Sequence, residues 1–355
     1  MPPAMRVNLY SDTQTRPTPE MRHAMAEAEV GDEQHFGDPT VNLLCERVAA
    51  LLGFEAAVFL PSGTMCNVIG FRLHIRAGGD EAYLHRTSHP IMAEAGGPAA
   101  ISGAVLHPLE GAHGMFDADT LAAAVRPVGD RYQPRSRLVS IEQTTNLAGG
   151  HVWPLAQLRD VVDVAKVNRL RLHLDGARLM NAVVASGVPA TEWTRGFDTA
   201  WLDFSKGLGA PMGAVLAGSH ETIEEAWRYK QMFGGALRQA GIVAAGALWA
   251  LDHHVDRLAQ DHEHARVLAE GLAELPGVEL DPTAVETNIV VFRVRDAQTL
   301  CAQLAASGVV MGPLDDRTVR AVTHLDVDAE GIGQALGAVR AVLAAEAPRK
   351  PARRS

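Results

Sequence analysis

A lysine and an aspartate, each placed at the end of a short apolar run, are the residues of this sequence best suited to chemistry. The run Thr199-Ala-Trp-Leu-Asp-Phe204 leads to Lys206, and the run Leu170-Arg-Leu-His-Leu-Asp175 ends in Asp175. Both runs are typical of buried strands, and open α/β sheets bind ligands at the carboxyl ends of their strands. A lysine amine there can condense with an aldehyde, while a carboxylate can pair with a protonated ring nitrogen. Together the two side chains predict a site that holds the two poles of a pyridoxal ring.

A third piece of such a site is the small-residue turn Pro61-Ser-Gly-Thr64, which follows the predicted strand Ala56–Leu60 and opens a helix. The backbone N–H groups at a helix start bind phosphate, which gives Gly63 and Thr64 a possible task. The same turn is also a common helix cap. Its place beside the predicted lysine and aspartate strand ends favours phosphate binding.

The elements that must position these residues alternate between strand and helix from residue 40 to about residue 218. Such alternation predicts a mostly parallel sheet that is covered on both faces. The predicted strands end near residues 61, 86, 143, 175 and 205, so these ends would converge on one crevice. The sequence therefore predicts a single site at one edge of the sheet.

His89 follows the predicted strand Glu81–His85. His85 and His89 are four residues apart, a spacing that puts two metal ligands on one helical face. Pro90 disfavours helical geometry at His89, so no metal site is predicted. Ring stacking or proton transfer is the functional interpretation of His89, and a histidine at the start of a helix is the structural one.

Composition limits the class of protein. The 355 residues are 47% hydrophobic and 21% charged, which suggests a globular protein of two domains. A formal net charge of −10 argues against nucleic acid as a partner. The three cysteines are too few and too scattered for a disulfide framework or a zinc site. With no signal segment and no apolar run of about 20 residues, a cytoplasmic protein that binds no membrane is expected.

The predicted domains follow changes in pattern along the chain. Two groups of acidic residues and histidines near the predicted boundary, 252–256 and 261–264, are expected to form a salt-bridged solvated surface rather than a metal site. The divisions are an N-terminal arm over 1–20, a large α/β domain over 21–254, a small α+β domain over 255–346, and a disordered basic tail over 347–355.

With these pieces placed, the chain resembles the L-threonine aldolase family of the β-eliminating lyase group, which has the pyridoxal-phosphate-dependent aspartate-aminotransferase fold. The motifs that carry the resemblance run in family order from residue 8 to residue 326 and are specific in combination. They are Ser11-Asp-Thr-Gln-Thr-Arg-Pro17, Asp38-Pro-Thr40, Phe59-Leu-Pro-Ser-Gly-Thr64, His89 with Glu94-Ala-Gly-Gly97, His173-Leu-Asp-Gly-Ala-Arg178, Ser205-Lys-Gly-Leu-Gly209, Gly234-Gly-Ala-Leu-Arg-Gln239 and Arg320-Ala-Val-Thr-His-Leu-Asp326.

The resemblance implies a role for each predicted site residue. Lys206 would form the Schiff base with pyridoxal 5'-phosphate, Asp175 would pair with the pyridine nitrogen, and His89 would stack on the ring. The phosphate would be held by Gly63, Thr64 and Ser205, and by Arg238 from the partner subunit. The substrate carboxylate would be bound by Ser11, Arg178 and Arg320.

The resemblance also implies an activity and an assembly. The enzyme would cleave the Cα–Cβ bond of a β-hydroxy-α-amino acid such as L-threonine or L-allo-threonine, releasing glycine and an aldehyde. It would be a homotetramer built from dimers that share active sites. Two alternatives stay open: a related pyridoxal enzyme that transaminates, racemises or eliminates, and a non-catalytic sheet protein that binds a small anion.

Two departures from the family pattern concern the substrate. The family commonly has Glu-Asn-Thr-His-Asn where this chain has Glu142-Gln-Thr-Thr-Asn146, so Thr145 replaces a histidine thought to contact the β-hydroxyl. A threonine hydroxyl can orient that group but is too weak a base to deprotonate it. His89 or an ordered water would then take the proton. His35-Phe36 also replaces the usual Tyr-Gly, so the substrate and its β-carbon stereochemistry are left open.

Overall fold

The computed structural model describes residues 6–346, which fall into two compact units. The larger unit is Thr15–Ala259, and the smaller joins the residues up to Gln14 with those from Gln260 onward. The division near residue 260 lies a few residues beyond the boundary that the sequence pattern suggested. The predicted disordered tail, 347–355, lies outside the described residues.

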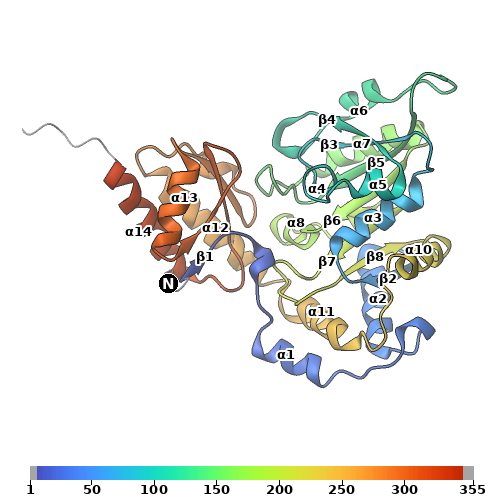
Figure 1. Ribbon diagram of the computed structural model, residues 1–355, viewed down its shortest axis with the longest axis horizontal. Coiled ribbons are helices and arrows are strands. Elements are labelled where there is room, and N and C mark those ends of the chain that lie inside the picture. The colour runs from blue at the N-terminus through green and yellow to red at the C-terminus, as the bar shows by residue number, and fades with distance from the viewer. Residues whose placement is uncertain (1–5, 347–355) are drawn as a thin grey trace, which may run out of the picture. The chain divides into compact units, whose positions relative to one another are not determined.

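The larger unit is built on a seven-stranded sheet (Figure 1). Five neighbouring strands are parallel, and β8 runs antiparallel between β2 and β7. The mostly parallel sheet predicted from the strand–helix alternation is therefore confirmed. The spatial order is β2 (Ala56–Leu60), β8 (Ala214–Gly218), β7 (Thr199–Asp203), β6 (Arg171–Gly176), β5 (Arg135–Glu142), β3 (Asp80–His85) and β4 (Val105–Leu109).

Helices connect these strands and cover the sheet. Their alternation with the strands is the pattern that the sequence predicted for this part of the chain. Those of the larger unit are α1 (Pro19–Ala26), α2 (Pro39–Leu52), α3 (Gly63–His74), α4 (His89–Met92), α5 (Gly97–Ser102), α6 (Ala118–Ala124), α7 (Leu155–Val167), α8 (Leu179–Ser186), α9 (Ala190–Thr194), α10 (His220–Met232) and α11 (Gly241–His253), with short 3₁₀ turns η2 (Glu33–His35) and η3 (Ala112–Gly114).

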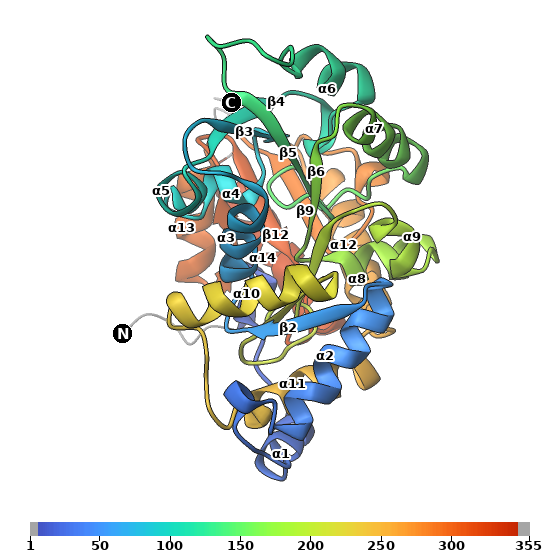
Figure 2. The ribbon, with the colours of Figure 1, turned by 90° about the vertical axis from the view of Figure 1, so that its right-hand side faces the viewer.

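Strand β6 shows how the sequence divides the two faces of the sheet. Successive side chains of a strand point to opposite faces. Leu172 and Leu174 belong to the main apolar core together with buried residues of α7, whereas His173 and Asp175 turn toward α3. Figure 2 shows α3 and α7 on opposite sides of β6. One face of the sheet thus supplies core packing, and the other carries buried polar groups.

The smaller unit has its own sheets and its own apolar core. Strand β1 (Val7–Asn8) pairs in parallel with β10 (Val309–Val310), so the first residues described belong to a sheet of this unit. A three-stranded antiparallel sheet has the order β11 (Gly312–Pro313), β12 (Thr318–Val322), β9 (Ile289–Arg293). The unit is completed by 3₁₀ turns η1 (Asp12–Gln14) and η4 (Pro282–Ala284), and by helices α12 (Leu258–Ala273, which begins in the larger unit), α13 (Ala297–Ala306) and α14 (Ala329–Glu346).

Two local expectations are corrected. The acidic and histidine groups near residue 260 are not wholly solvated, because His254, Asp261 and His264 are buried. Part of the cluster is exposed and salt-bridged: Asp252 pairs with Arg47 at 2.6 Å, and Glu263 pairs with Arg266 at 2.5 Å. Helical geometry does occur at His89, since α4 begins there and Pro90 occupies an initial position where proline loses no hydrogen bond.

Within residues 6–346 no group of three or more histidine, cysteine or acidic side chains is arranged to hold a metal ion. Over the same residues, no helix is long and apolar enough to cross a membrane.

Candidate active site

The predicted site residues follow the carboxyl ends of adjacent parallel strands in the larger unit. Glu142 of β5 lies beside Asp175 of β6, which in turn lies beside Trp201 of β7. The three residues form a row across the sheet on the face covered by α3. Two positions earlier on each strand, Ser140, His173 and Thr199 form a second row on the same face.

Lys206 lies just after β7 and is largely buried. Its Nζ forms an ion pair with Asp203 and lies 5.7 Å from the centre of the Trp201 ring. The other oxygen of Asp203 accepts hydrogen bonds from the backbone N–H of Ser205 at 3.0 Å and from its hydroxyl at 2.8 Å. A carboxylate therefore holds the Ser205–Lys206 turn from within and keeps the lysine amine in place.

Asp175 is buried and receives two hydrogen bonds. The backbone N–H of Ala177 donates to Oδ1 at 3.0 Å, and the amide of Asn67 donates to Oδ2 at 2.8 Å. Each carboxylate oxygen has a second lone pair, so Asp175 can accept a further hydrogen bond from a protonated ring nitrogen.

His89 forms a carboxylate–imidazole pair with Glu94. Nδ1 of His89 lies 2.8 Å from Oε1 of Glu94, and the hydrogen bond from this ring to the carboxylate raises the pKa of His89. Burial opposes that shift, while the negative charge of Asp175 adds to it. Because Glu94 accepts the proton on Nδ1, the other ring nitrogen of neutral His89 is left as the proton acceptor.

Glu142 was not predicted as a site residue, yet its titration is strongly perturbed. Burial raises the pKa of Glu142 to about 7, and the charge of Asp175 acts in the same direction. The backbone N–H of Asn146 donates to Glu142 at 2.9 Å and opposes the shift. Perturbed carboxyl groups of this kind cluster at functional sites.

The turn predicted to bind phosphate opens helix α3, whose N-cap is Ser62. The Ser62 hydroxyl accepts the N–H of Met65 at 3.2 Å, which is one of the four N–H groups that a helix start leaves without a backbone partner. The N–H groups of Gly63 and Thr64 belong to the same first turn. A Cβ at Gly63 would clash with the Trp201 ring, so glycine is required there by packing against β7 as well as by any ligand.

Arg178 and Thr145 are both buried at the same edge. The backbone N–H of Arg178 donates to the carbonyl of Gln143 at 3.3 Å, which ties the end of β6 to the end of β5. The hydroxyl of Thr145 accepts the backbone N–H of His151 at 3.1 Å. Thr145 is thus engaged by the main chain of the next loop.

Three further predicted residues have their own local contacts. Arg238 is exposed and pairs with Asp32 at 2.8 Å within its own chain. Ser11 and Arg320 belong to the smaller unit, where Arg320 reaches the carbonyl of Tyr10 at 3.5 Å. Their roles in binding phosphate or substrate stay predictions.

The polar groups at the strand ends fit a pyridoxal phosphate molecule. Within residues 6–346, three buried polar atoms near this edge have no hydrogen-bond partner: Glu94 Oε2, Gln143 Nε2 and Thr144 Oγ1. Buried polar atoms are normally paired, so such a group indicates a missing ligand or water. With the amine of Lys206 and the remaining acceptor capacity of Asp175, they suit a ring that carries polar substituents.

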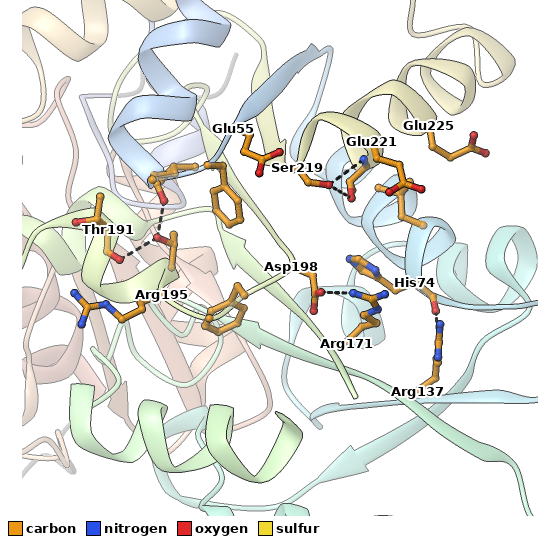
Figure 3. A pocket seen from close by; sticks show the side chains of 18 residues that line it. Glu55, His74, Arg137, Arg171, Thr191, Arg195, Asp198, Ser219, Glu221 and Glu225 are labelled. Atoms are coloured by element: carbon orange, nitrogen blue, oxygen red, sulfur yellow. Dashed lines mark hydrogen bonds and ion pairs between the residues drawn. The ribbon is translucent and has the colours of Figure 1, made fainter. Parts of the chain in front are cut away.

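A separate cavity of about 830 Å³ opens at the opposite edge of the sheet (Figure 3). Its lining includes Arg137 and Arg171 near the starts of β5 and β6, and Figure 3 shows Arg171 facing Asp198, with which it pairs at 2.5 Å. This cavity lies at the amino ends of the parallel strands. It is therefore distinct from the predicted site, because Lys206 and Asp175 follow the carboxyl ends.

Four residues that hold the site were not singled out from the sequence: Asn67, Glu94, Trp201 and Asp203. All of them lie inside or beside the motifs that carried the family resemblance. Proximity to a motif was the signal available: Glu94 and Asp203 pair with site residues nearby in the chain, whereas Asn67 meets Asp175 108 positions away.

The β-eliminating lyase family model matches residues 8–295 of this chain. Low-specificity L-threonine aldolase 1 of Arabidopsis thaliana is 38% identical over 327 residues, covering 90% of this chain and 91% of the plant protein. Low specificity L-threonine aldolase of Escherichia coli strain K12 is 38% identical over 341 residues, covering 95% of this chain and 99% of the bacterial protein.

Similarity to solved structures concerns the fold. The structure of Leishmania major threonine aldolase matches with a TM-score of 0.82 at 19% identity, covering 95% of this chain and 100% of that chain. At this identity the likeness shows the fold alone, and it confirms the predicted aspartate-aminotransferase-like class. The extent of the family match and the identity of the relatives also bear out the resemblance seen in the motifs: the chain belongs to the β-eliminating lyase family.

Proposed function

We propose that this protein is a pyridoxal-phosphate-dependent aldolase that cleaves β-hydroxy-α-amino acids to glycine and an aldehyde. The observation that carries the proposal is the pair of charged side chains at adjacent strand ends, Lys206 held by Asp203 and Asp175 held by Asn67. The relatives that share 38% identity with the chain are named as L-threonine aldolases of low specificity, which supports the same reaction.

Each residue has a task in binding the cofactor. Lys206 would hold it covalently, Asp175 would pair with its ring nitrogen, and the first turn of α3 with Ser205 would bind its phosphate. When bound, pyridoxal phosphate supplies an electron sink for the bond that breaks at Cα. Asp175 is suited to its part because hydrogen bonds from Ala177 and Asn67 fix its carboxylate and leave lone pairs for the ring nitrogen.

The proton on the substrate β-hydroxyl needs an acceptor. We infer that His89 is this base, because Glu94 accepts from Nδ1 and leaves the second ring nitrogen available. Its pKa is raised, which makes the imidazole a stronger base when it is neutral. Thr145 would orient the hydroxyl rather than deprotonate it, since its own oxygen already accepts a backbone N–H.

The substrate carboxylate calls for a buried cation. Arg178 is buried at the end of β6, close enough to Glu142 for its charge to lower that carboxyl's pKa. A guanidinium binds a carboxylate through two parallel hydrogen bonds and so fixes the orientation of the amino acid. Ser11 and Arg320 are proposed as further carboxylate ligands.

Assembly and compartment complete the proposal. We infer a homo-oligomer with shared active sites, a dimer or a pair of dimers, in which Arg238 binds the phosphate of the partner. A reducing compartment such as the cytoplasm suits the three cysteines, Cys45, Cys66 and Cys301, none of which forms a disulfide.

The test is to mix purified protein and pyridoxal phosphate with L-threonine, L-allo-threonine and phenylserine, and to assay glycine and aldehyde. Wild-type protein is expected to show visible cofactor absorbance and to release both products, and Lys206→Ala is expected to lose both properties. A keto acid or ammonia as the product would favour a related transaminase or eliminating lyase. Absorbance unchanged in Lys206→Ala would contradict the covalent role of the lysine.

A further inference from the structure

Helix α3 presents a row of four residues to strands β6 and β7. Gly63, Asn67, Gly70 and His74 recur at intervals of three and four, so they share one face of the helix. The two glycines allow close approach, because a Cβ at Gly63 would clash with Trp201 and one at Gly70 would clash with His173. This close packing brings the two polar side chains of the row into contact with polar groups of the sheet.

The contacts form a continuous chain of hydrogen bonds that starts at Asp175. Asn67 Nδ2 lies 2.8 Å from Asp175 Oδ2, and Asn67 Oδ1 lies 3.1 Å from His173 Nε2. On its other side, His173 Nδ1 lies 2.8 Å from the Thr199 hydroxyl. That hydroxyl lies 2.8 Å from His74 Nε2, at the end of α3. The chain therefore joins the predicted partner of the ring nitrogen to the far end of the helix.

The amide of Asn67 has a partner for each of its hydrogen-bonding positions. Its two N–H groups point to Asp175 and, at 2.7 Å, to Glu94. Its oxygen accepts from the Trp201 indole N–H at 2.8 Å and from His173. The reversed amide would direct its oxygen at two carboxylates, so only one orientation satisfies the site.

Each hydrogen bond in this series then has an assigned donor and acceptor. His173 must donate from Nε2, because the Asn67 oxygen can only accept. Burial lowers the pKa of both His173 and His74 to about 3, so both rings are neutral. His173 Nδ1 therefore accepts from the Thr199 hydroxyl, which in turn accepts from His74 Nε2.

We propose that Asn67 is a positioning residue for Asp175, and that Thr199 and His173 hold its amide in the orientation that donates to this carboxylate. This inference rests on the proposed function, in which Asp175 pairs with the cofactor's ring nitrogen. One amide also donates to Glu94, the partner of His89, so Asn67 orients both the ring-nitrogen partner and the carboxylate that directs the base.

Pairing of the polar atoms of Asn67 and His173 fixes their orientation, because an unpaired buried polar group is costly. All the polar atoms of Asn67 and the ring nitrogens of His173 have partners, and the chain ends at His74. His74 also lines the cavity at the opposite edge of the sheet, where Figure 3 shows it beside Arg137.

The first experiment uses the cofactor-free protein and so does not depend on the proposed function. Nitrogen NMR of ¹⁵N-histidine protein is expected to show His173 and His74 as neutral rings protonated on Nε2. In Thr199→Val the hydroxyl that donates to His173 Nδ1 is absent, and the Nδ1 resonance of His173 should move toward that of a nitrogen without a hydrogen bond. Finding His173 protonated on Nδ1 in the wild type would overturn the assigned direction.

The second experiment measures cofactor affinity and kinetics. A hydrogen bond to a charged group is lost in Asn67→Ala, so the Kd for pyridoxal phosphate and kcat should each worsen by about tenfold to a hundredfold. KM for the amino acid should change little, since Asn67 contacts no part of the predicted carboxylate site. Thr199→Val should show the same pattern more weakly, and it keeps the test usable if Asn67→Ala does not fold.

Thr194→Val is the matched control. Thr194 is another buried threonine of the larger unit, whose hydroxyl donates to the carbonyl of Leu52 at 2.7 Å, outside the chain of contacts. It should lose stability as Thr199→Val does, while its cofactor affinity and the pH dependence of its cofactor absorbance remain those of the wild type. Wild-type values in Asn67→Ala, or equal losses in both threonine variants, would overturn the proposal. A wild type that binds no pyridoxal phosphate would instead refute the proposed function.

Discussion

At the scale of single residues, the acidic groups of the site differ in what surrounds them. Asp203 forms an ion pair with the lysine amine, and Asp175 accepts hydrogen bonds from an amide and a backbone N–H. Glu94 is hydrogen-bonded to an imidazole and to an amide. Glu142 is buried and accepts from the backbone N–H groups of His89 and Asn146. Each of the first three carboxylates is held by a side-chain partner, whereas burial raises the pKa of Glu142 to about 7.

Replacing Glu94 tests the origin of the His89 pKa. His89 must be neutral to accept a proton, so kcat/KM should fall as the pH drops below its pKa. The hydrogen bond to Glu94 raises that pKa. In Glu94→Gln the acidic limb of the kcat/KM profile should therefore move to lower pH. Glu110→Gln, an exposed site paired only with Arg86, should leave the limb in place. If the acidic limb of the Glu94→Gln profile stayed in place or moved to higher pH, the role of His89 as base would be contradicted.

Replacing Glu142 tests whether its buried carboxyl group is protonated in the folded protein. The pKa of Glu142 is about 7 in the folded protein and 4.5 in the unfolded chain. Its contribution to the free energy of unfolding is therefore fully present below pH 4.5 and is lost as the pH rises through 7. Glu142→Gln resembles the protonated form. Above neutrality the cofactor-free variant should be more stable than wild type by on the order of 3 kcal/mol, with near equality at low pH.

Urea unfolding at acidic and alkaline pH measures this difference. Glu225→Gln, at an exposed helical position paired with Arg228, should show no such pH dependence. An unfolding free energy of Glu142→Gln that runs parallel to that of the wild type across this range would show that Glu142 is already ionised in the folded protein.

At the scale of elements, a buried ion pair holds the segment that carries Arg238. Lys230 of α10 pairs with Glu33 of η2 at 2.8 Å, and both side chains are fully buried. The backbone N–H of Leu237 donates to the same carboxylate, and the N–H of Glu33 donates to the carbonyl of Arg238 at 3.0 Å. Two segments about 200 residues apart are thus joined where phosphate binding by Arg238 is proposed.

Breaking this pair should be costly. Glu33→Gln keeps the side-chain shape but leaves the Lys230 ammonium buried without a countercharge, so a loss of about 3–5 kcal/mol is expected in urea unfolding. Glu263→Gln removes an exposed partner of Arg266 and should cost less than about 1 kcal/mol. Similar small losses in both variants would show that Lys230 reaches solvent or loses its charge without penalty.

At the scale of the whole molecule, the chain has two units with separate cores, and the smaller contains two of the predicted carboxylate ligands. If Arg320 binds the substrate carboxylate, Arg320→Ala should raise KM by about tenfold or more and leave the cofactor absorbance unchanged. Arg317→Ala, which removes an exposed partner of Glu279, is the control and should leave KM unchanged. An unaltered KM in Arg320→Ala would remove this residue from the site.

Shared active sites make a second prediction at this scale. Lys206→Ala and Arg238→Ala subunits should each be weakly active alone. When the two are unfolded together and refolded as mixed dimers, half of the dimers are hybrids with one intact site, so about a quarter of wild-type activity should return. Simple averaging of the two parent activities would show that Arg238 serves its own subunit.

Many features of this protein could be predicted from local patterns in the sequence. The strand and helix order, and the places of Lys206 and Asp175 at strand ends, depend on short-range periodicity and turn residues. Those signals also led to the family. Local patterns were misleading near residue 260: His254 and Asp261 were expected to be solvated, but the structure buries them.

The tertiary structure decided which distant side chains meet. Asn67 reaches Asp175 across 108 positions of the chain, and Lys230 reaches Glu33 across 197. Such pairs depend on how α3 and α10 pack on other elements, and no local pattern encodes that packing. The type of chemistry could therefore be predicted from single residues, whereas the hydrogen bonds that orient those residues arise only when the chain is folded.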